Sequence, residues 1–288
     1  MEKHRSEFRI VKMAEVLSVS KSGYYKWRTR KPSKRTQEDQ DLLTKILIIY
    51  YASNKVFGSK KIKKELDKTI KPLVNHKRIE RIMHDNHIYA KVSRQYKVTT
   101  NSKHHLPVAE NLLNREFTAA CPNMKMVSDI TYVKTDEGWL YVASIIDLCG
   151  RKVVGSAMDK RMTKELVCNA LQDVYSRVGK VNGCLLHSDR GSQYCSFKYQ
   201  RLLKEYGFTC SMSRTGNCWD NAPMESFWCR LKEEWLSDQH FRTRDEAKSV
   251  VFEYIWIFYN RKRTHETNDY LTPEEYYNRA KTTVAEAA

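Results

Sequence analysis

The second half of the chain has apolar positions spaced as strands and helices in a definite order. Three short segments rich in β-branched and aromatic residues are separated by turns: MKMVSDITYV (124–133), WLYVASIIDL (139–148) and KVVGSAM (152–158). They predict a three-stranded antiparallel meander. After them the pattern predicts a helix at about 163–178, a strand leading to Asp189, a helix at about 193–206, a strand at 208–213 and a long helix from about 222. This is the element order of an RNase H-like α/β domain.

The first third has the spacing of helices only. Residues 10–28 (IVKMAEVLSVSKSGYYKWR) predict an apolar helix that ends near Leu17, a turn, and a second short helix. Residues 37–91 predict further helices, one of which starts at a Ser59 cap and another at an Asn75 cap. Both regions fit helix-turn-helix units, which bind DNA. An ordinary helical hairpin and a three-helix domain with a solvated basic face are the alternatives.

Charge is divided unevenly along the chain. Its 288 residues carry a net charge of +17, and residues 1–106 hold 26 Lys and Arg against 10 Asp and Glu. The remainder, 107–288, is nearly neutral, with 25 against 24. A basic segment joined to a near-neutral one favours a polyanion-binding region attached to a catalytic domain, rather than a merely soluble surface. The candidate DNA contacts on the predicted helices are Ser22, Tyr24, Lys26, Arg28, Lys60, Lys61, Lys77, Arg78 and Arg81.

These patterns divide the chain into five parts. We predict a helix-turn-helix segment (1–35), a second helix-turn-helix-like domain (36–98), a linker (99–119), an RNase H-like core (120–265) and a C-terminal helical tail (266–288). The pair His104-His105 falls in the linker and lacks partners at zinc spacing. We expect neither a membrane span nor a signal peptide, because no apolar run is long enough, and we read the eight cysteines as reduced.

Three acidic residues stand out by their position. Asp129 lies in the middle of a predicted strand, where an acid is unfavourable unless it has a purpose. Asp189 follows the end of another strand, and Glu225 lies in a first helical turn just after Pro223. The 35 residues between Asp189 and Glu225 carry little weight by themselves, because other acids in the chain share that spacing.

A basic residue belongs with these acids. Lys232 lies seven positions after Glu225, which returns it to the same helical face. It can contact a phosphate there, and an ordinary exposed lysine is the alternative. Converged carboxylates repel one another, and divalent cations remove that cost. Oxygen ligands suit Mg²⁺ or Mn²⁺, so Asp129, Asp189 and Glu225 predict a metal site for in-line displacement at phosphorus with two ions.

Longer motifs around these residues resemble a known family. SDITYV (128–133), HSDRGSQY (187–194), SRTGNCWDNAPMESFWCRLKEE (213–234), VSKSGYYKW (19–27), FGSKKIKKEL (57–66) and YIWIFYNRKRTHETNDYLTPEEYY (254–277) carry the resemblance, which covers nearly the whole chain. The sequence is similar to the retroviral-integrase-type DDE transposases, and within them to the catalytic-frame protein (OrfB) of the IS-three family of bacterial insertion sequences.

The resemblance implies a role for each part. Asp129, Asp189 and Glu225 would be the metal-binding triad, and Lys232 would match the basic residue that follows the glutamate. The enzyme would cut one strand at the inverted-repeat ends of a mobile element and join the freed 3′-hydroxyl to DNA, through a circular intermediate. Its partners would be element-end and target DNA, at least one further copy of itself, and an upstream-frame protein fused by frameshifting. We expect it in the bacterial cytoplasm, with the nucleoid.

Two other functions compete with this interpretation. A DNA-binding regulator with an inert catalytic domain would explain the basic front, but the intact carboxylates argue against it. A nuclease without joining activity would explain the carboxylates, and the run WDNAPMESFW (219–228) disfavours it.

Overall fold

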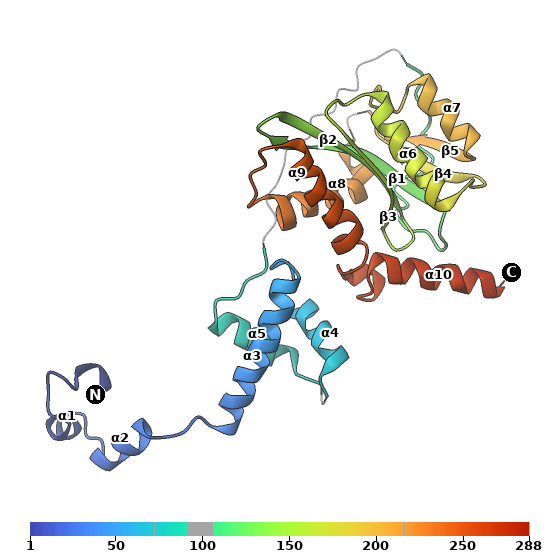
Figure 1. The fold of residues 1–288 in the computed structure, drawn as a ribbon. Coiled ribbons are helices and arrows are strands. Elements are labelled where there is room, and N and C mark those ends of the chain that lie inside the picture. Colours follow the sequence, from blue (N-terminus) through green and yellow to red (C-terminus); the bar gives the residue numbers. More distant parts are fainter. Residues whose placement is uncertain (72, 92–105, 216, 288) are drawn as a thin grey trace.

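The computed structural model describes residues 1–71, 73–91, 106–215 and 217–287. Within them lie an N-terminal helical hairpin, a helical domain and an α/β core (Figure 1). None of the helices among these described residues is long and apolar enough to cross a membrane.

The hairpin has almost no core of its own. After the short η1 (Glu2–His4), helices α1 (Ile10–Val16) and α2 (Lys21–Arg28) are joined by a turn, as the sequence predicts. Ser20 caps α2 by accepting a hydrogen bond from the Gly23 backbone N–H at 3.1 Å. Only Ala14 and Tyr24 are buried in these helices. In Figure 1 the hairpin lies apart from the rest of the chain.

The helical domain consists of α3 (Lys34–Ala52), α4 (Ser59–Thr69) and α5 (His76–Asp85). The apolar faces of these helices meet in its interior, where Leu42, Ile46, Ile62, Leu66, Ile79, Ile82 and Met83 are all buried. Asn75 caps α5 as expected. The predicted Ser59 cap is wrong, because the N-cap of α4 is Gly58 and the Ser59 hydroxyl instead contacts His76 Nε2 at 3.0 Å.

The core is built on one five-stranded sheet. Its strands are β1 (Lys125–Thr135), β2 (Gly138–Asp147), β3 (Lys152–Asp159), β4 (Cys184–Ser188) and β5 (Phe208–Met212). The spatial order is β3-β2-β1-β4-β5, with β1–β2 and β2–β3 antiparallel and β1–β4 and β4–β5 parallel. This mixed sheet confirms the RNase H-like prediction, including the meander.

Each face of the sheet has its own helical layer. Along β1 the side chains alternate, so Met126 packs with α6 (Lys164–Val178) and α7 (Phe197–Glu205), whereas Val127 packs with α8 (Ala222–Leu231) and α9 (Arg244–Phe252). A Cβ on Gly155 of β3 would lie 2.4 Å from Val174 Cγ2, so only glycine lets α6 approach this closely. The π-helical segments η3 (Lys232–Leu236) and η4 (Glu253–Tyr259) extend α8 and α9, and η2 (Cys218–Asn221), η5 (Glu266–Asn268) and α10 (Pro273–Ala287) complete the core.

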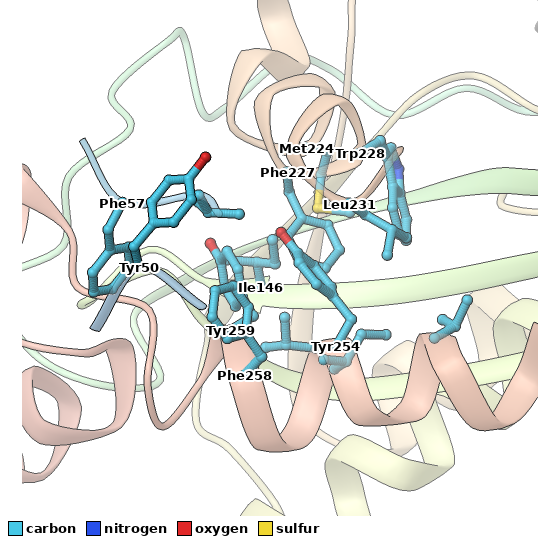
Figure 2. Packing of buried hydrophobic residues seen from close by; sticks show 14 of the residues in the cluster. Tyr50, Phe57, Ile146, Met224, Phe227, Trp228, Leu231, Tyr254, Phe258 and Tyr259 are labelled. Atoms are coloured by element: carbon cyan, nitrogen blue, oxygen red, sulfur yellow. The ribbon is translucent and has the colours of Figure 1, made fainter. Parts of the chain in front are cut away.

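The helical domain is docked on the core. Tyr50 and Phe57 belong to the same buried cluster as Phe258 and Tyr259 of the core (Figure 2). The Asn54 side chain donates a hydrogen bond to the Glu234 carbonyl at 2.9 Å.

The described part of the predicted linker, residues 106–119, also packs on the core. Leu113 is buried, and the Leu112 and Leu113 backbone N–H groups both donate to Ser211 Oγ. The Met212 backbone N–H donates to the Glu110 carbonyl at 3.2 Å. This stretch therefore packs along β5. Residues 99–105, with His104 and His105, lie outside the described residues.

Candidate active site

The strand register brings the two aspartates together. Strands β1 and β4 run parallel, with Lys125 opposite Leu185 and Val127 opposite His187. Continued by two residues, this register sets Asp129 beside Asp189, which directly follows the end of β4. Residues two apart on a strand point to the same face, so both carboxylates lie on the face that α8 covers. The sequence reasoning placed each aspartate on its strand but could not give this register.

Asp129 is held in a poorly solvated position. Trp228 of α8 donates its indole N–H to Asp129 Oδ2 at 3.2 Å. Burial raises the pKa of Asp129 to about 8, and the Asp189 charge is the next largest cause, with Glu225 a smaller one. Hydrogen bonds from the Ile130 backbone and from Trp228 act in the opposite direction. A carboxyl group that its neighbours make costly to ionise is the arrangement that a nearby cation would relieve.

Asp189 is fixed by the tight turn that follows β4. The Gly191 backbone N–H donates to Asp189 Oδ1 at 2.8 Å. A Cβ on Gly191 would lie 3.0 Å from that same oxygen, so a larger residue would crowd the carboxylate. Tyr194, from the same motif, is buried, and its hydroxyl lies 3.0 Å from Ser128 Oγ, next to Asp129. The motif HSDRGSQY thus joins the two strands at the site.

Glu225 and Lys232 approach the site from α8 and its extension. Glu225 lies in the first turn of α8, which has Pro223 at its start, and burial raises the pKa of Glu225. Lys232 begins η3, and its Nζ lies 4.8 Å from the centre of the Tyr132 ring. Burial lowers the pKa of Lys232, while the charges of Tyr132 and Asp129 act against that change. All four predicted residues therefore converge on one region of the core.

The carboxylates have the chemistry of a magnesium site but are not gathered as one. Across residues 1–71, 73–91, 106–215 and 217–287, no three Asp, Glu, His or Cys side chains form a group that could hold a metal ion. The Asp189 charge is the second-largest cause of the raised pKa of Asp129, whereas the Glu225 charge is a smaller one. The oxygen donors of these three carboxylates fit Mg²⁺ in chemical type.

Asp220 is a residue that the sequence reasoning missed. It is fully buried and accepts hydrogen bonds from Arg115 and Arg214 side chains at 2.8 Å each, from the Arg214 backbone and from Asn111. The hydrogen bond from Arg214 is the main reason that the pKa of Asp220 lies well below its usual range. Asp220 fastens the loop before α8, and so Glu225, to residues 106–119. Its place in the motif WDN was the available indication.

The predicted DNA contacts are placed unevenly. Ser22, Lys26, Arg28, Lys60 and Lys77 are exposed. Tyr24 is buried and its hydroxyl donates to the Glu2 carboxylate, so it supports the hairpin instead.

The other three candidates are engaged within the protein. Lys61 faces the core, where burial, followed by the Arg263 charge, lowers its pKa to about 7. Arg78 and Arg81 both pair with Asp39 of α3, at 2.7 and 2.5 Å. Lys61 is therefore turned away from any DNA that binds the outer surface of the helical domain. Arg78 and Arg81 could contact such DNA only while they are paired with Asp39, or by leaving that pair.

Comparison with known families agrees with this architecture. Residues 119–218 and 206–273 each match a family model of an integrase core domain, and residues 37–96 match an HTH-like domain. The fold and these matches therefore define a protein of the integrase-core class. A simian T-cell lymphotropic virus intasome structure aligns with 75% of this chain and 70% of its own, at 15% identity and a TM-score of 0.47.

Curated relatives narrow the class. The chain is 44% identical over 272 residues to an uncharacterized 31 kDa protein of insertion element IS600 from Shigella sonnei, covering 93% of this chain and all of that one. It is 41% identical over 281 residues to transposase InsF of insertion sequence IS3A from Escherichia coli K12, covering 97% of each. The chain belongs to the IS3 family of insertion-sequence transposases.

Proposed function

We propose that this transposase cleaves one DNA strand at each inverted-repeat end of its insertion sequence and joins the freed 3′-hydroxyl to DNA. The observation that supports this most directly is the β1–β4 register, which sets Asp129 beside Asp189 with Glu225 and Lys232 over the same face. We further propose that these three carboxylates bind Mg²⁺, with two ions per site and Mn²⁺ as a substitute. When bound, the ions would activate the attacking oxygen and stabilise the leaving one.

The chain's own groups would prepare this site. The Trp228 indole and the Gly191 backbone N–H hold the two aspartates in place before DNA arrives. Lys232 would bind a phosphate oxygen of the strand being cut, since a hydrogen bond from an ammonium to a phosphate oxygen is charge-assisted and strong. The integrase-core and HTH-like matches support DNA as the substrate. An element has two ends, so we propose an assembly of at least two copies, with the upstream-frame protein as a further partner.

The test compares wild type with Glu225→Gln on labelled element ends in Mg²⁺. We expect the variant to give neither cleaved nor joined product. Glu205→Gln, on the exposed end of α7, is the matched control and should behave as wild type. Normal joining by Glu225→Gln would refute the proposal, and cleavage without joining by wild type would favour the nuclease.

A second measurement does not depend on activity. Mg²⁺ bound only by the folded protein should raise its melting temperature. We expect this rise in wild type and in Glu205→Gln, and its loss in Asp129→Asn. An equal rise in Asp129→Asn would place the metal elsewhere.

A further inference from the structure

The helix that carries the active-site lysine ends against the helical domain. A helix leaves its last four carbonyls without intrahelical partners. At the end of η3, three of them are satisfied locally: Ser237 Oγ donates to Glu233, Gln239 Nε2 to Trp235 and the Gln239 backbone to Leu236. The Glu234 carbonyl is different. It accepts from Asn54 Nδ2 at 2.9 Å and from Lys91 Nζ at 3.3 Å.

The two donors are held as one unit. Asn54 lies in the α3–α4 turn with a φ of 53°, a left-handed conformation that asparagine tolerates. The Lys91 backbone N–H donates to the carbonyl of Lys55, the residue after Asn54, at 3.1 Å. Lys91 Nζ also pairs with Asp238 just beyond η3, at 2.9 Å. A cation at the C-terminal end of a helix is favourable for the helix dipole as well.

Glu234 is fixed from the other side too. Its carboxylate forms a paired contact with Arg263, at 2.8 Å to Nε and 2.5 Å to the terminal nitrogen. Both side chains are nearly buried, at 11% and 7% exposed. Tyr50 and Phe57 add apolar contact across the same boundary (Figure 2). The position of Glu234 is therefore set jointly by the helical domain and by the core.

Lys232 lies two residues before Glu234 in the same π-helical turn. The π form is rare and occurs mostly as single turns, frequently at functional sites. In this turn Lys232 Nζ lies 4.8 Å from the Tyr132 ring centre and close enough to Asp129 for that charge to act on it. Because the turn is only five residues long, a contact that fixes Glu234 also fixes the direction in which Lys232 points.

We propose that Asn54 and Lys91 are positioning residues, through which the docked helical domain holds η3 and aims Lys232 at the scissile phosphate. This rests on the proposed function, in which Lys232 binds that phosphate. It assigns the helical domain a part in the chemical step besides DNA binding. Undocking of the domain would leave the carboxylates in place and move the lysine.

The test removes the Asn54 carboxamide alone. Asn54→Gly keeps the left-handed backbone accessible. The matched control, Asn86→Gly, removes a carboxamide that donates to the Ile82 carbonyl at 2.8 Å within the helical domain. We expect Asn54→Gly to slow single-turnover joining at saturating DNA about tenfold, because small misplacements of a positioning group are costly. The dissociation constant for element DNA should stay unchanged, and the control should match wild type in both.

A double-variant cycle asks whether the effect passes through Lys232. In a Lys232→Ala background, Asn54→Gly should cause no further loss, since two residues acting through one interaction are not additive. A full additional loss would overturn the proposal. So would an unchanged rate in the single variant, or a weaker DNA affinity that accounts for the loss.

Hydrogen exchange keeps the test separate from the proposed function. Amides of residues 232–236 should exchange faster in Asn54→Gly than in wild type, and at the wild-type rate in Asn86→Gly. If wild type joined no DNA, the proposed function would fail, and unchanged exchange would then show independently that the contact does not hold η3. Faster exchange together with the rate loss supports the inference.

Discussion

The ion pairs of the core and of the helical domain differ in how far they are exposed to solvent. In the core, Arg263 and Glu234 form a pair that is 7% and 11% exposed. In the helical domain, Arg81 pairs with Asp39 while 47% exposed. A buried charge is costly unless it is paired, and in the core Arg263 and Glu234 supply that pairing to each other. An exposed pair is worth little, so the charges of the helical domain can be exchanged for contacts with a polyanion.

This difference changes what the net charge of +17 means. Lys61, in the most basic helix, faces the core and is partly buried beside Arg263, and the neighbouring Lys64 is exposed but has its Nζ 4.9 Å from the centre of the Tyr270 ring. The cations that remain exposed, among them Lys60 and Lys77, are the better candidates for DNA. Position within the docked structure, rather than charge count, decides which basic residues can bind.

The largest expected effect comes from breaking the buried pair. Arg263→Met should lower the free energy of unfolding by about 3–5 kcal/mol, because it leaves Glu234 buried without its partner. The double variant Glu234→Gln with Arg263→Met should recover part of that loss, since it removes the stranded charge. Urea unfolding of both variants measures this. A loss below about 1 kcal/mol would mean that this pair contributes no more than an exposed surface pair, and that the core and the helical domain do not differ in this respect.

A smaller effect should appear with pH at His187. This buried histidine lies between Ser211 Oγ at 2.8 Å and Ser213 Oγ at 3.1 Å, and burial lowers its pKa from 6.5 to about 4. Between those values the unfolded chain binds a proton that the folded protein does not. The contribution of neutral His187 to the free energy of unfolding is therefore fully present above about pH 6.5. It is lost as the pH falls towards 4, by at most about 1.4 kcal/mol per pH unit.

His187→Gln isolates that contribution. The variant should be less stable than wild type at neutral pH, where it lacks the imidazole hydrogen bonds. The difference in free energy of unfolding between the two proteins should become smaller as the pH falls. Only wild type loses stability through His187, because its unfolded state binds a proton there that its folded state does not. Unfolding curves from pH 7 to 4 would reveal this, and curves that stay parallel would contradict a neutral buried His187.

The strands and helices near the site could be predicted from the sequence, because the features that specify them lie within or next to each element. The apolar runs around Asp129 and before Asp189 specify strands, and Pro223 marks the start of α8, so the residues of the site could be named. Their register could not be, since it depends on pairing between strands that are far apart in the chain. Whether these four residues carry the chemistry stays a prediction.

What the sequence did not reveal depends on distant contacts. Asn54 meets Glu234 across 180 positions. Lys61 resembles any exposed lysine on an amphipathic helix, and only the docked core shows otherwise. The π-helical turns η3 and η4 could not be predicted from the spacing of apolar residues. A single π turn changes that spacing too little to distinguish it from an α-helix.

The smallest expected effect separates two neighbouring cations of α5. Lys77 is exposed and forms no ion pair with any residue that the structure describes, whereas Arg78 is 28% exposed and bonded to Asp39. Lys77→Ala should leave stability unchanged and reduce the slope of log K against log salt by about 0.9 if Lys77 neutralises one phosphate. Arg78→Ala should cost up to about 1 kcal/mol of stability and change the slope less. Chemical unfolding and DNA titrations at several salt concentrations provide both numbers. The reverse pattern would mean that Arg78 leaves Asp39 for DNA, and that even a half-buried pair in the helical domain is exchangeable.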